Sequence, residues 1–322
     1  MIKPSDVSKM LNPVYVLIVG VLGGSIPFVM YMWNFPVSTQ PVAQKFTYAP
    51  SFPTWVFLLS VLFSGLSIIV IPGWKACSLL YSSVISQGRN KSWKVTGVLV
   101  VSALMYLLVL LALFALGGRV ITLPVSDFLD ELNNRFTIVY IYSAIGFLPI
   151  MFSIILINYM AEILLSEIAV VTDNEKNTAE FIQFYLYYRN ALQICLITSG
   201  IILSLNPIIT AAYASIWKEV GVFTKDTFPS QGIIIYGLII TLLLIFIYAP
   251  TYFNLTNVGR ELRDAKYPYP QQLDDLKGIM EKRKTLDELL QINIGITENL
   301  KNGIFTLSPL VSGLIAGLLG FK

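Results

Sequence analysis

Long apolar stretches separated by short charged segments dominate the pattern of the chain. A membrane-spanning helix needs about 20 apolar residues, and a charge at its centre costs a few kcal/mol or more. Uncharged stretches therefore locate the spans, and six of them are long enough to be assigned directly. We predict an all-α, polytopic helical membrane protein with spans at residues 12–33, 54–74, 95–116, 139–160, 192–213 and 233–255.

A seventh apolar stretch, residues 303–321, is only just long enough to cross a bilayer. We expect Ser308 and Pro309 to interrupt a helix there, because proline removes a backbone hydrogen bond and clashes with the preceding turn. The pattern therefore favours a re-entrant or docked segment over a seventh span. The chain divides into a six-helix transmembrane domain (1–255), a cytoplasmic helical tail (256–302) and an apolar C-terminal segment (303–322).

Basic residues are distributed unequally between the two sets of loops. The N-terminus, two of the loops and the tail after the sixth span hold 16 Lys and Arg, whereas the opposite loops hold five. Loops rich in Lys and Arg stay in the cytoplasm. We therefore place the N-terminus and the tail inside, and the short loops and lone thiols suit a bacterial inner (plasma) membrane.

All five tryptophans lie at or just beyond predicted span ends. An indole ring prefers the headgroup level of a bilayer, because it is amphipathic. We expect these side chains to face that level: Trp33, Trp55, Trp74, Trp93 and Trp217.

Composition narrows the class of protein further. Of the 322 residues, 55% are hydrophobic and 13% are charged, about half the usual charge of a soluble domain. That excludes an ordinary soluble enzyme, a disordered protein and a nucleic-acid-binding domain. There is no histidine, and Cys77 and Cys195 are far apart, so the sequence predicts no enzyme, no metal site and no cofactor.

No charged residue lies within the six predicted spans. Proton-coupled pumps and many carriers need ionisable groups near the midplane, so this absence argues against them. Prolines in five spans predict kinked helices, at Pro27, Pro72, Pro149, Pro207 and Pro250. The fifth span has polar residues beside its proline. Either they line a pore or cavity, or their hydroxyls bond their own helix; the candidates are Ser199, Ser204, Asn206, Pro207 and Thr210.

Small residues mark two candidate sites of close helix packing. Gly20 and Gly24 form a GxxxG motif in the first span, and Gly313 and Gly317 form another near the C-terminus. Glycine at this spacing lets two backbones approach closely. The contact is either within one chain or between copies.

Three cytoplasmic segments show helical spacing. Residues 76–87 are amphipathic, and we expect them to lie along the inner membrane surface. Residues 178–189 carry an aromatic stripe that predicts packing in a core. Thr285 and Glu288 read as a capping box that opens a second short helix in the tail. The stripe consists of Phe181, Phe184, Tyr185 and Tyr188.

Basic residues of the tail form the remaining candidate site. They bind either anionic lipid headgroups or an anionic ligand such as a nucleotide, and no glycine-rich phosphate loop accompanies them. The candidates are Arg260, Arg263, Lys266, Lys282, Arg283 and Lys284.

Three functions fit these features. The first is an oligomeric channel or membrane-permeabilising effector, for instance a bacterial defence effector, gated by its cytoplasmic helices. The second is a membrane scaffold or anchor subunit that recruits a soluble partner. The third, disfavoured by the missing midplane charges, is a small-molecule carrier. The partners that the sequence predicts are the bilayer with its anionic headgroups, further copies of the chain, and a cytoplasmic protein or nucleotide.

Overall fold

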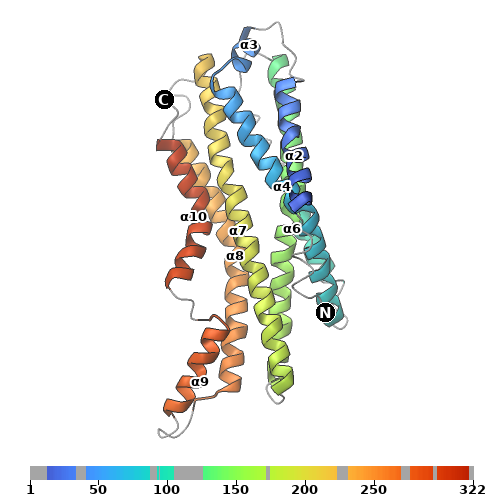
Figure 1. Ribbon diagram of the computed structural model, residues 1–322, viewed down its shortest axis with the longest axis vertical. Coiled ribbons are helices and arrows are strands. Elements are labelled where there is room, and N and C mark those ends of the chain that lie inside the picture. The colour runs from blue at the N-terminus through green and yellow to red at the C-terminus, as the bar shows by residue number, and fades with distance from the viewer. Residues whose placement is uncertain are drawn as a thin grey trace.

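The computed structural model of the chain describes residues 13–33, 41–87, 93, 95–104, 126–171, 175–222, 231–269, 276–292 and 296–318. Its long helices lie side by side along one axis (Figure 1). In chain order the labelled elements are α2 (Pro13–Phe28), the π-helical turn η1 (Val29–Trp33), α3 (Pro41–Thr47), α4 (Ser51–Gln87), α6 (Ser126–Val171), α7 (Glu175–Val220), α8 (Gln231–Lys266), α9 (Leu276–Leu289) and α10 (Ile296–Leu318).

Five helices of the described residues are long and apolar enough to cross a membrane, which makes this a multi-pass helical membrane protein. They cover Pro13–Met32, Ser51–Ser86, Thr137–Ile168, Thr178–Val220 and Gln231–Lys266. Four of them contain a predicted span in full, and Pro13–Met32 covers the predicted span 12–33 except for its two end residues. Of the predicted span 95–116, the structure describes the apolar helix Val95–Leu104, and the rest lies outside the described residues.

Four of the helices are much longer than a bilayer is thick. α6 and α7 have 46 residues each, or about 69 Å at 1.5 Å per residue, against about 30 Å of hydrocarbon. The prediction that residues 76–87 lie along the membrane surface is wrong, because they continue α4 without a break. Cys77, Leu80 and Val84 explain this, since they pack into a buried core with α6 and α7.

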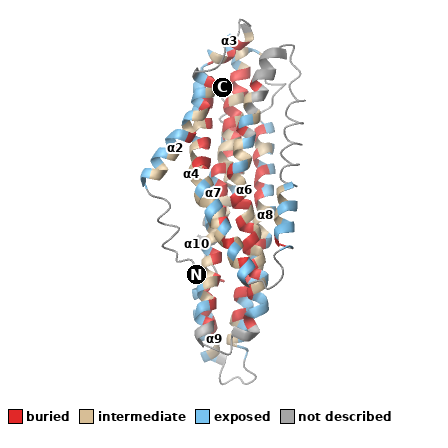
Figure 2. Ribbon diagram, turned by 90° about the vertical axis from the view of Figure 1, so that its right-hand side faces the viewer, coloured by how far each residue is buried: buried red, intermediate tan, exposed pale blue. Residues whose placement is uncertain are grey.

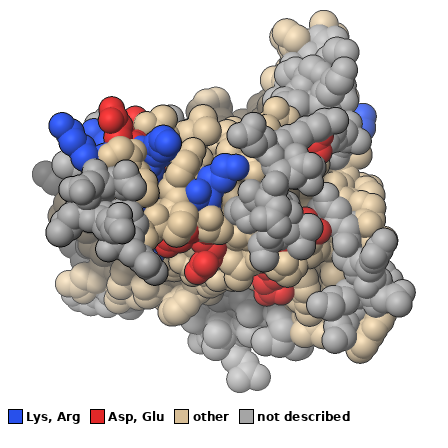
Figure 3. Space-filling view, turned by 90° about the horizontal axis from the view of Figure 1, so that it is seen from below, with Lys and Arg blue, Asp and Glu red and all other residues tan. Residues whose placement is uncertain are grey.

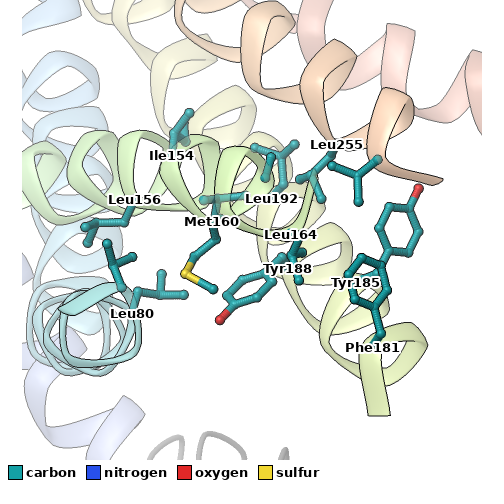
Figure 4. Close-up of a cluster of buried hydrophobic side chains, with 14 of the residues drawn as sticks. Leu80, Ile154, Leu156, Met160, Leu164, Phe181, Tyr185, Tyr188, Leu192 and Leu255 are labelled. Carbon is teal, nitrogen blue, oxygen red and sulfur yellow. The ribbon is translucent and has the colours of Figure 1, made fainter. Parts of the chain in front are cut away.

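Two hydrophobic cores follow one another along the bundle, and buried residues run through most of its length (Figure 2). The first core, at the α9 end, joins α4, α6, α7, α8 and the end of α9. Figure 4 shows Leu80 of α4, Met160 of α6 and Tyr188 of α7 meeting within it. The predicted aromatic stripe packs here: Phe181, Tyr185 and Tyr188 are buried, and Phe184 packs against them partly buried.

The second core, at the α3 end, is built around aromatic rings. Phe46 of α3 lies 5.0 Å from Trp217 and 6.2 Å from Trp55, measured between ring centroids. Both indoles are fully buried, so the expectation that they face the headgroup level is wrong. Their large apolar rings pack instead in edge-on and tilted contacts with other aromatic side chains. Trp74 and Trp93 are exposed, so their place at the headgroup level stays a prediction, and the side chain of Trp33 lies outside the described residues.

The C-terminal apolar segment is one helix, α10, and Pro309 lies inside it. The prediction that Ser308 and Pro309 interrupt the helix, and with it the re-entrant hairpin, is wrong. Membrane helices tolerate proline where hydroxyls satisfy the freed groups, and the Ser308 hydroxyl lies 2.7 Å from the carbonyl oxygen of Phe305. α10 packs along α7 and α8 and rises toward the α3 end (Figure 1).

Candidate functional site

A cluster of four charged side chains fastens α9 to the last turn of α8. Arg263 Nε donates to Asp264 Oδ1 at 2.8 Å, and its Nη1 lies 3.2 Å from both carboxylate oxygens of Asp287. Arg283 donates to Asp264 and to the carbonyl oxygen of Tyr267. We call Arg263, Asp264, Arg283 and Asp287 the charge clamp. Each arginine meets a carboxylate from the other helix, so the clamp crosses the interface in both directions.

Local sequence places the clamp where α8 ends. Tyr267 follows the last helical residue, and Pro268, which lacks a backbone N–H, cannot continue the helical hydrogen bonds. The chain leaves the helix here, and the guanidinium of Arg283 stacks 3.9 Å from the ring centroid of Tyr269. Cation–π contact and ion pairing therefore hold the same arginine, whose side chain is only 5% exposed.

Apolar packing also holds the C-terminal end of α9 against the bundle. Leu286 and Leu290 of α9, and Ile292 just after it, are buried against the end of α8. Gln291 has a φ of 55°, and this left-handed turn directs Ile292 back into the core. The prediction of a separate helix opened by a Thr285 cap is wrong, because α9 runs unbroken through Thr285, whose hydroxyl donates to the Glu281 carbonyl at 3.0 Å.

The six basic candidates of the tail fall into two groups. Arg263 and Arg283 are engaged in the charge clamp. Arg260, Lys282 and Lys284 are exposed and Lys266 is partly exposed, and Lys284 lies 4.0 Å from Glu288 in a fully solvated pair. Figure 3, which views the molecule from the α9 end, shows basic side chains there with acidic ones among them. Only the exposed group is accessible to an anionic ligand as the chain stands.

The polar candidates of the fifth span lie on the continuous helix α7, which passes through Pro207. The Ser204 hydroxyl donates to the Ile201 carbonyl at 2.7 Å, and that of Thr210 to the Asn206 carbonyl at 2.9 Å. Ser199 is fully buried, and its hydroxyl has no hydrogen-bond partner among the residues that the structure describes. Within one chain these residues thus lie on a packed helix, and a role in lining a pore stays a prediction.

The first glycine pair lies against α4 of the same chain. The Ser64 hydroxyl donates to the Gly20 carbonyl at 2.8 Å, and a Cβ built on Gly24 would lie 2.3 Å from Ser64 Oγ. Gly23, between them, is tighter still, with 1.8 Å to Ser67 Oγ. Close packing at these positions therefore occurs within one chain, between α2 and α4.

The second glycine pair lies on α10. A Cβ on Gly313 would lie 3.1 Å from the Ile233 carbonyl oxygen, and one on Gly237 would lie 2.6 Å from the Pro309 carbonyl oxygen. Gly317 is buried one turn further on. A Cβ on Gly200 of α7 would lie 2.4 Å from the Phe305 carbonyl oxygen. Small residues on α7 and α8 thus form the surface on which α10 packs.

A groove of about 390 Å³ lies between α2 and α4. Its lining contains no charged residue: Val21, Gly24, Ser25, Phe28, Met32, Pro53, Val56, Phe57 and Ser60. Such a surface suits an acyl chain better than a polar ligand. Among the described residues, no group of three or more His, Cys, Asp or Glu side chains could hold a metal ion.

Sequence reasoning missed the acidic half of the charge clamp. Asp264 and Asp287 stand in a tail with many charges of both signs, and nothing in their spacing shows which arginine each will meet. It also missed Glu219, whose carboxylate accepts from the Ser51 hydroxyl at 2.6 Å and from the Ser51 N–H at 3.0 Å. This contact caps the start of α4 from the end of α7.

Comparison with protein-family models, with curated proteins and with solved structures finds no match to this chain.

Proposed function

We propose that the chain assembles into an oligomeric channel or membrane-permeabilising effector that is gated by its cytoplasmic helices. The observation that carries this proposal is the charge clamp. α9 is fastened directly to the last turn of α8, which is one of the helices able to span the membrane. A ligand or partner that displaces α9 would therefore act on a spanning helix without any intermediate element.

The packing of a single copy supports an oligomer. Both cores are filled by large side chains, among them Tyr185 and Tyr188 at one end and Trp55 and Trp217 at the other. The hydroxyls of α7 that could line a path are bonded to their own helix at Ser204 and Thr210. A conducting path is therefore expected between copies, where hydroxyl-bearing faces and apolar constrictions can meet.

Orientation belongs to the same proposal. With 16 basic residues in one set of loops and the tail, and five in the other, the α9 end faces the cytoplasm of a bacterium and the α3 end faces outward. α10 rises toward the α3 end, so a spanning α10 would place the C-terminus outside. A reporter fused after Lys322, compared with one inserted in α9, tests both statements. A C-terminal reporter active only inside would exclude a spanning α10.

Ion flux from purified protein in liposomes tests the channel. Asp287→Asn removes one carboxylate from the charge clamp, and we expect it to raise basal flux because α9 is released more often. Lys284→Gln is the matched control, since its pair with Glu288 is solvated and lies outside the clamp. Equal flux from the wild type and both variants would show that the charge clamp does not control gating. No flux under any condition would exclude the channel.

The second candidate function is a scaffold that recruits a soluble partner. It is favoured by the length of α6, α7 and α8, which projects a helical end beyond the membrane, and by the exposed Arg260, Lys282 and Lys284 on that end. A nucleotide or acidic protein would bind there, since Arg263 and Arg283 are engaged. Replacing Lys282 and Lys284 by glutamine should then abolish partner capture and leave the clamp intact. We infer no catalytic activity, and a carrier remains the least supported role.

A further inference from the structure

Arg189 of α7 is a buried cation outside the charge clamp. Its residue is 7% exposed, and its Nη1 donates to the Tyr185 hydroxyl at 2.8 Å. The guanidinium carbon lies 6.0 Å from the ring centroid of Tyr252 on α8. Its Nη2 is buried, and within the described part of the chain it has no hydrogen-bond partner. Two neutral tyrosines thus surround a group that carries a full charge.

Such an arrangement is unfavourable unless an anion completes it. Arginine stays protonated in proteins, and a buried charge without a counter-charge is strongly destabilising. Arg263 and Arg283 illustrate the usual solution, because both meet a carboxylate. Among the residues that the structure describes, no carboxylate forms an ion pair with Arg189. A hydroxyl and a ring face stabilise the cation only in part.

The depth of Arg189 indicates where the anion comes from. The residue stands three positions before the predicted start of the fifth span, and Tyr252 stands three positions before the predicted end of the sixth. Both therefore lie near the headgroup level of the leaflet at the α9 end. Tyrosines gather at this level in membrane proteins, and the phosphates of that leaflet lie at the same height.

The rings around Arg189 also provide a route in from the lipid. Tyr248 and Tyr252 stack with their centroids 5.8 Å apart, and both are partly exposed. The Tyr252 ring lies over the guanidinium, and Tyr248 stacks on Tyr252. On the inner side, Tyr185 is fully buried and packs closely on Gly259, where a Cβ would lie 2.8 Å from its hydroxyl oxygen. Tyr185 is therefore held in place, and the partly exposed Tyr248 and Tyr252 are the side chains that would have to rotate to admit a phosphate.

We propose that Arg189 binds the phosphate of an anionic phospholipid headgroup in the leaflet at the α9 end. The guanidinium Nη2 donates to a phosphate oxygen, and the Tyr185 hydroxyl holds the opposite edge of the guanidinium in place. An anionic headgroup is preferred to a choline headgroup, because choline brings its own cation. The bound lipid would join α7 to α8 just above the charge clamp. This inference does not rest on conductance, since a scaffold could hold the same lipid.

Lipid retention by the full-length protein tests the proposal. Purified wild type, Arg189→Gln and the exposed control Arg260→Gln are loaded with phosphatidylglycerol, washed with detergent and examined by native mass spectrometry. We expect wild type and Arg260→Gln to retain one lipid per chain, and Arg189→Gln to lose at least about tenfold in retention. Equal retention by Arg189→Gln would overturn the proposal.

Two further arms separate the alternatives. Phosphatidylcholine and inorganic phosphate are offered in place of phosphatidylglycerol, and thermal unfolding is followed in each. We expect stabilisation by phosphatidylglycerol alone. Equal stabilisation by inorganic phosphate would show that Arg189 binds a free anion. That result would overturn the proposal that the phosphate belongs to a lipid. If Arg189→Gln does not fold, Arg189→Lys replaces it: it keeps the charge but not the planar fork of donors. Undiminished retention by that variant would count against a role for Nη2.

Discussion

At the α3 end of the bundle aromatic rings close the core, whereas at the α9 end charged side chains do. Phe46 enters a cluster of rings that includes Trp55 and Trp217, all of them fully buried. α9 also buries leucines, but its attachment to α8 depends on the charge clamp, in which Asp264 is 47% exposed. The same chain thus uses two kinds of closure at its two ends.

The difference teaches how each end responds to its surroundings. Packing of rings depends on shape and on the exclusion of water, so salt hardly alters it. Ion pairs that water reaches are screened by salt and compete with other charges. The packing of the α3 end should therefore be insensitive to salt, whereas the attachment of α9 should weaken as salt rises.

Removing a ring from the α3 end should have the largest effect. Trp217→Ala deletes a fully buried indole from the aromatic core, and we expect a loss of about 3–5 kcal/mol in the free energy of unfolding. Denaturant unfolding in detergent measures it. Trp93→Ala is the control, since Trp93 is 72% exposed. If the two variants unfolded alike, the aromatic cluster would not be the main closure of this end.

Crowding the surface on which α10 packs should have the next largest effect. Gly237→Ala places a Cβ 2.6 Å from the Pro309 backbone oxygen, so α10 must shift, and overpacking of this kind costs about 1–3 kcal/mol. Gly232→Ala, on the same helix, has nothing within 4 Å of its Cβ and serves as the control. Thermal unfolding checks both. Equal midpoints would mean that α10 is not held where the structure places it.

Breaking the charge clamp should affect only the α9 end. Asp287→Asn leaves Arg263 with Asp264 alone, and we expect α9 to undock more easily by about 1–3 kcal/mol. Amide hydrogen exchange measures this, with faster exchange in α9 and unchanged exchange in α3. Lys284→Gln should leave both rates as they are, because its pair is solvated. Faster exchange at the α3 end as well would show that the two ends are coupled.

Salt should give the smallest effect and the clearest contrast. Raising NaCl from about 0.1 M to about 1 M shortens the screening length from about 10 Å to about 3 Å. We expect amide exchange in α9 to quicken by up to a fewfold, since the part of the clamp at Asp264 is open to solvent. Exchange around Phe46 should not change. A response at Phe46 equal to that in α9 would remove the distinction between the two ends.

Much of the fold is readable from the sequence, because hydrocarbon imposes strict rules on a chain. Five of the predicted spans coincide with the helices that are long and apolar enough to cross a membrane. A charge at the midplane is costly, so an uncharged stretch of sufficient length can be recognised as a span from the sequence. The sequence cannot distinguish the two placements of residues 76–87, because both give an amphipathic pattern. A helix that lies on the membrane surface has one apolar face, and so does a helix that packs on its neighbours, as the end of α4 does. Pro309 does not interrupt α10, because the Ser308 hydroxyl bonds the Phe305 carbonyl, and a simple rule for breaking helices leaves such side-chain partners out.

The candidate site is less readable. Arg263 and Arg283 were recognisable as basic residues of the tail, but their carboxylate partners were not, because a clamp between residues 264 and 283 depends on how the chain folds back after Pro268. Arg189 gave no signal at all, since one arginine at a span edge is ordinary. Its burial among tyrosines appears only when α8 is placed beside α7.

The sequence by itself determined that this is a multi-pass helical membrane protein, because local composition decides which segments a bilayer accepts. It also determined which residues carry charge, and that none of them lies within the predicted spans. Tertiary structure alone decided which charges neutralise one another, which tryptophans are core, and that α10 lies along α7 and α8. These features depend on contacts between residues far apart in the chain, and the pattern along the sequence does not show which distant residues meet.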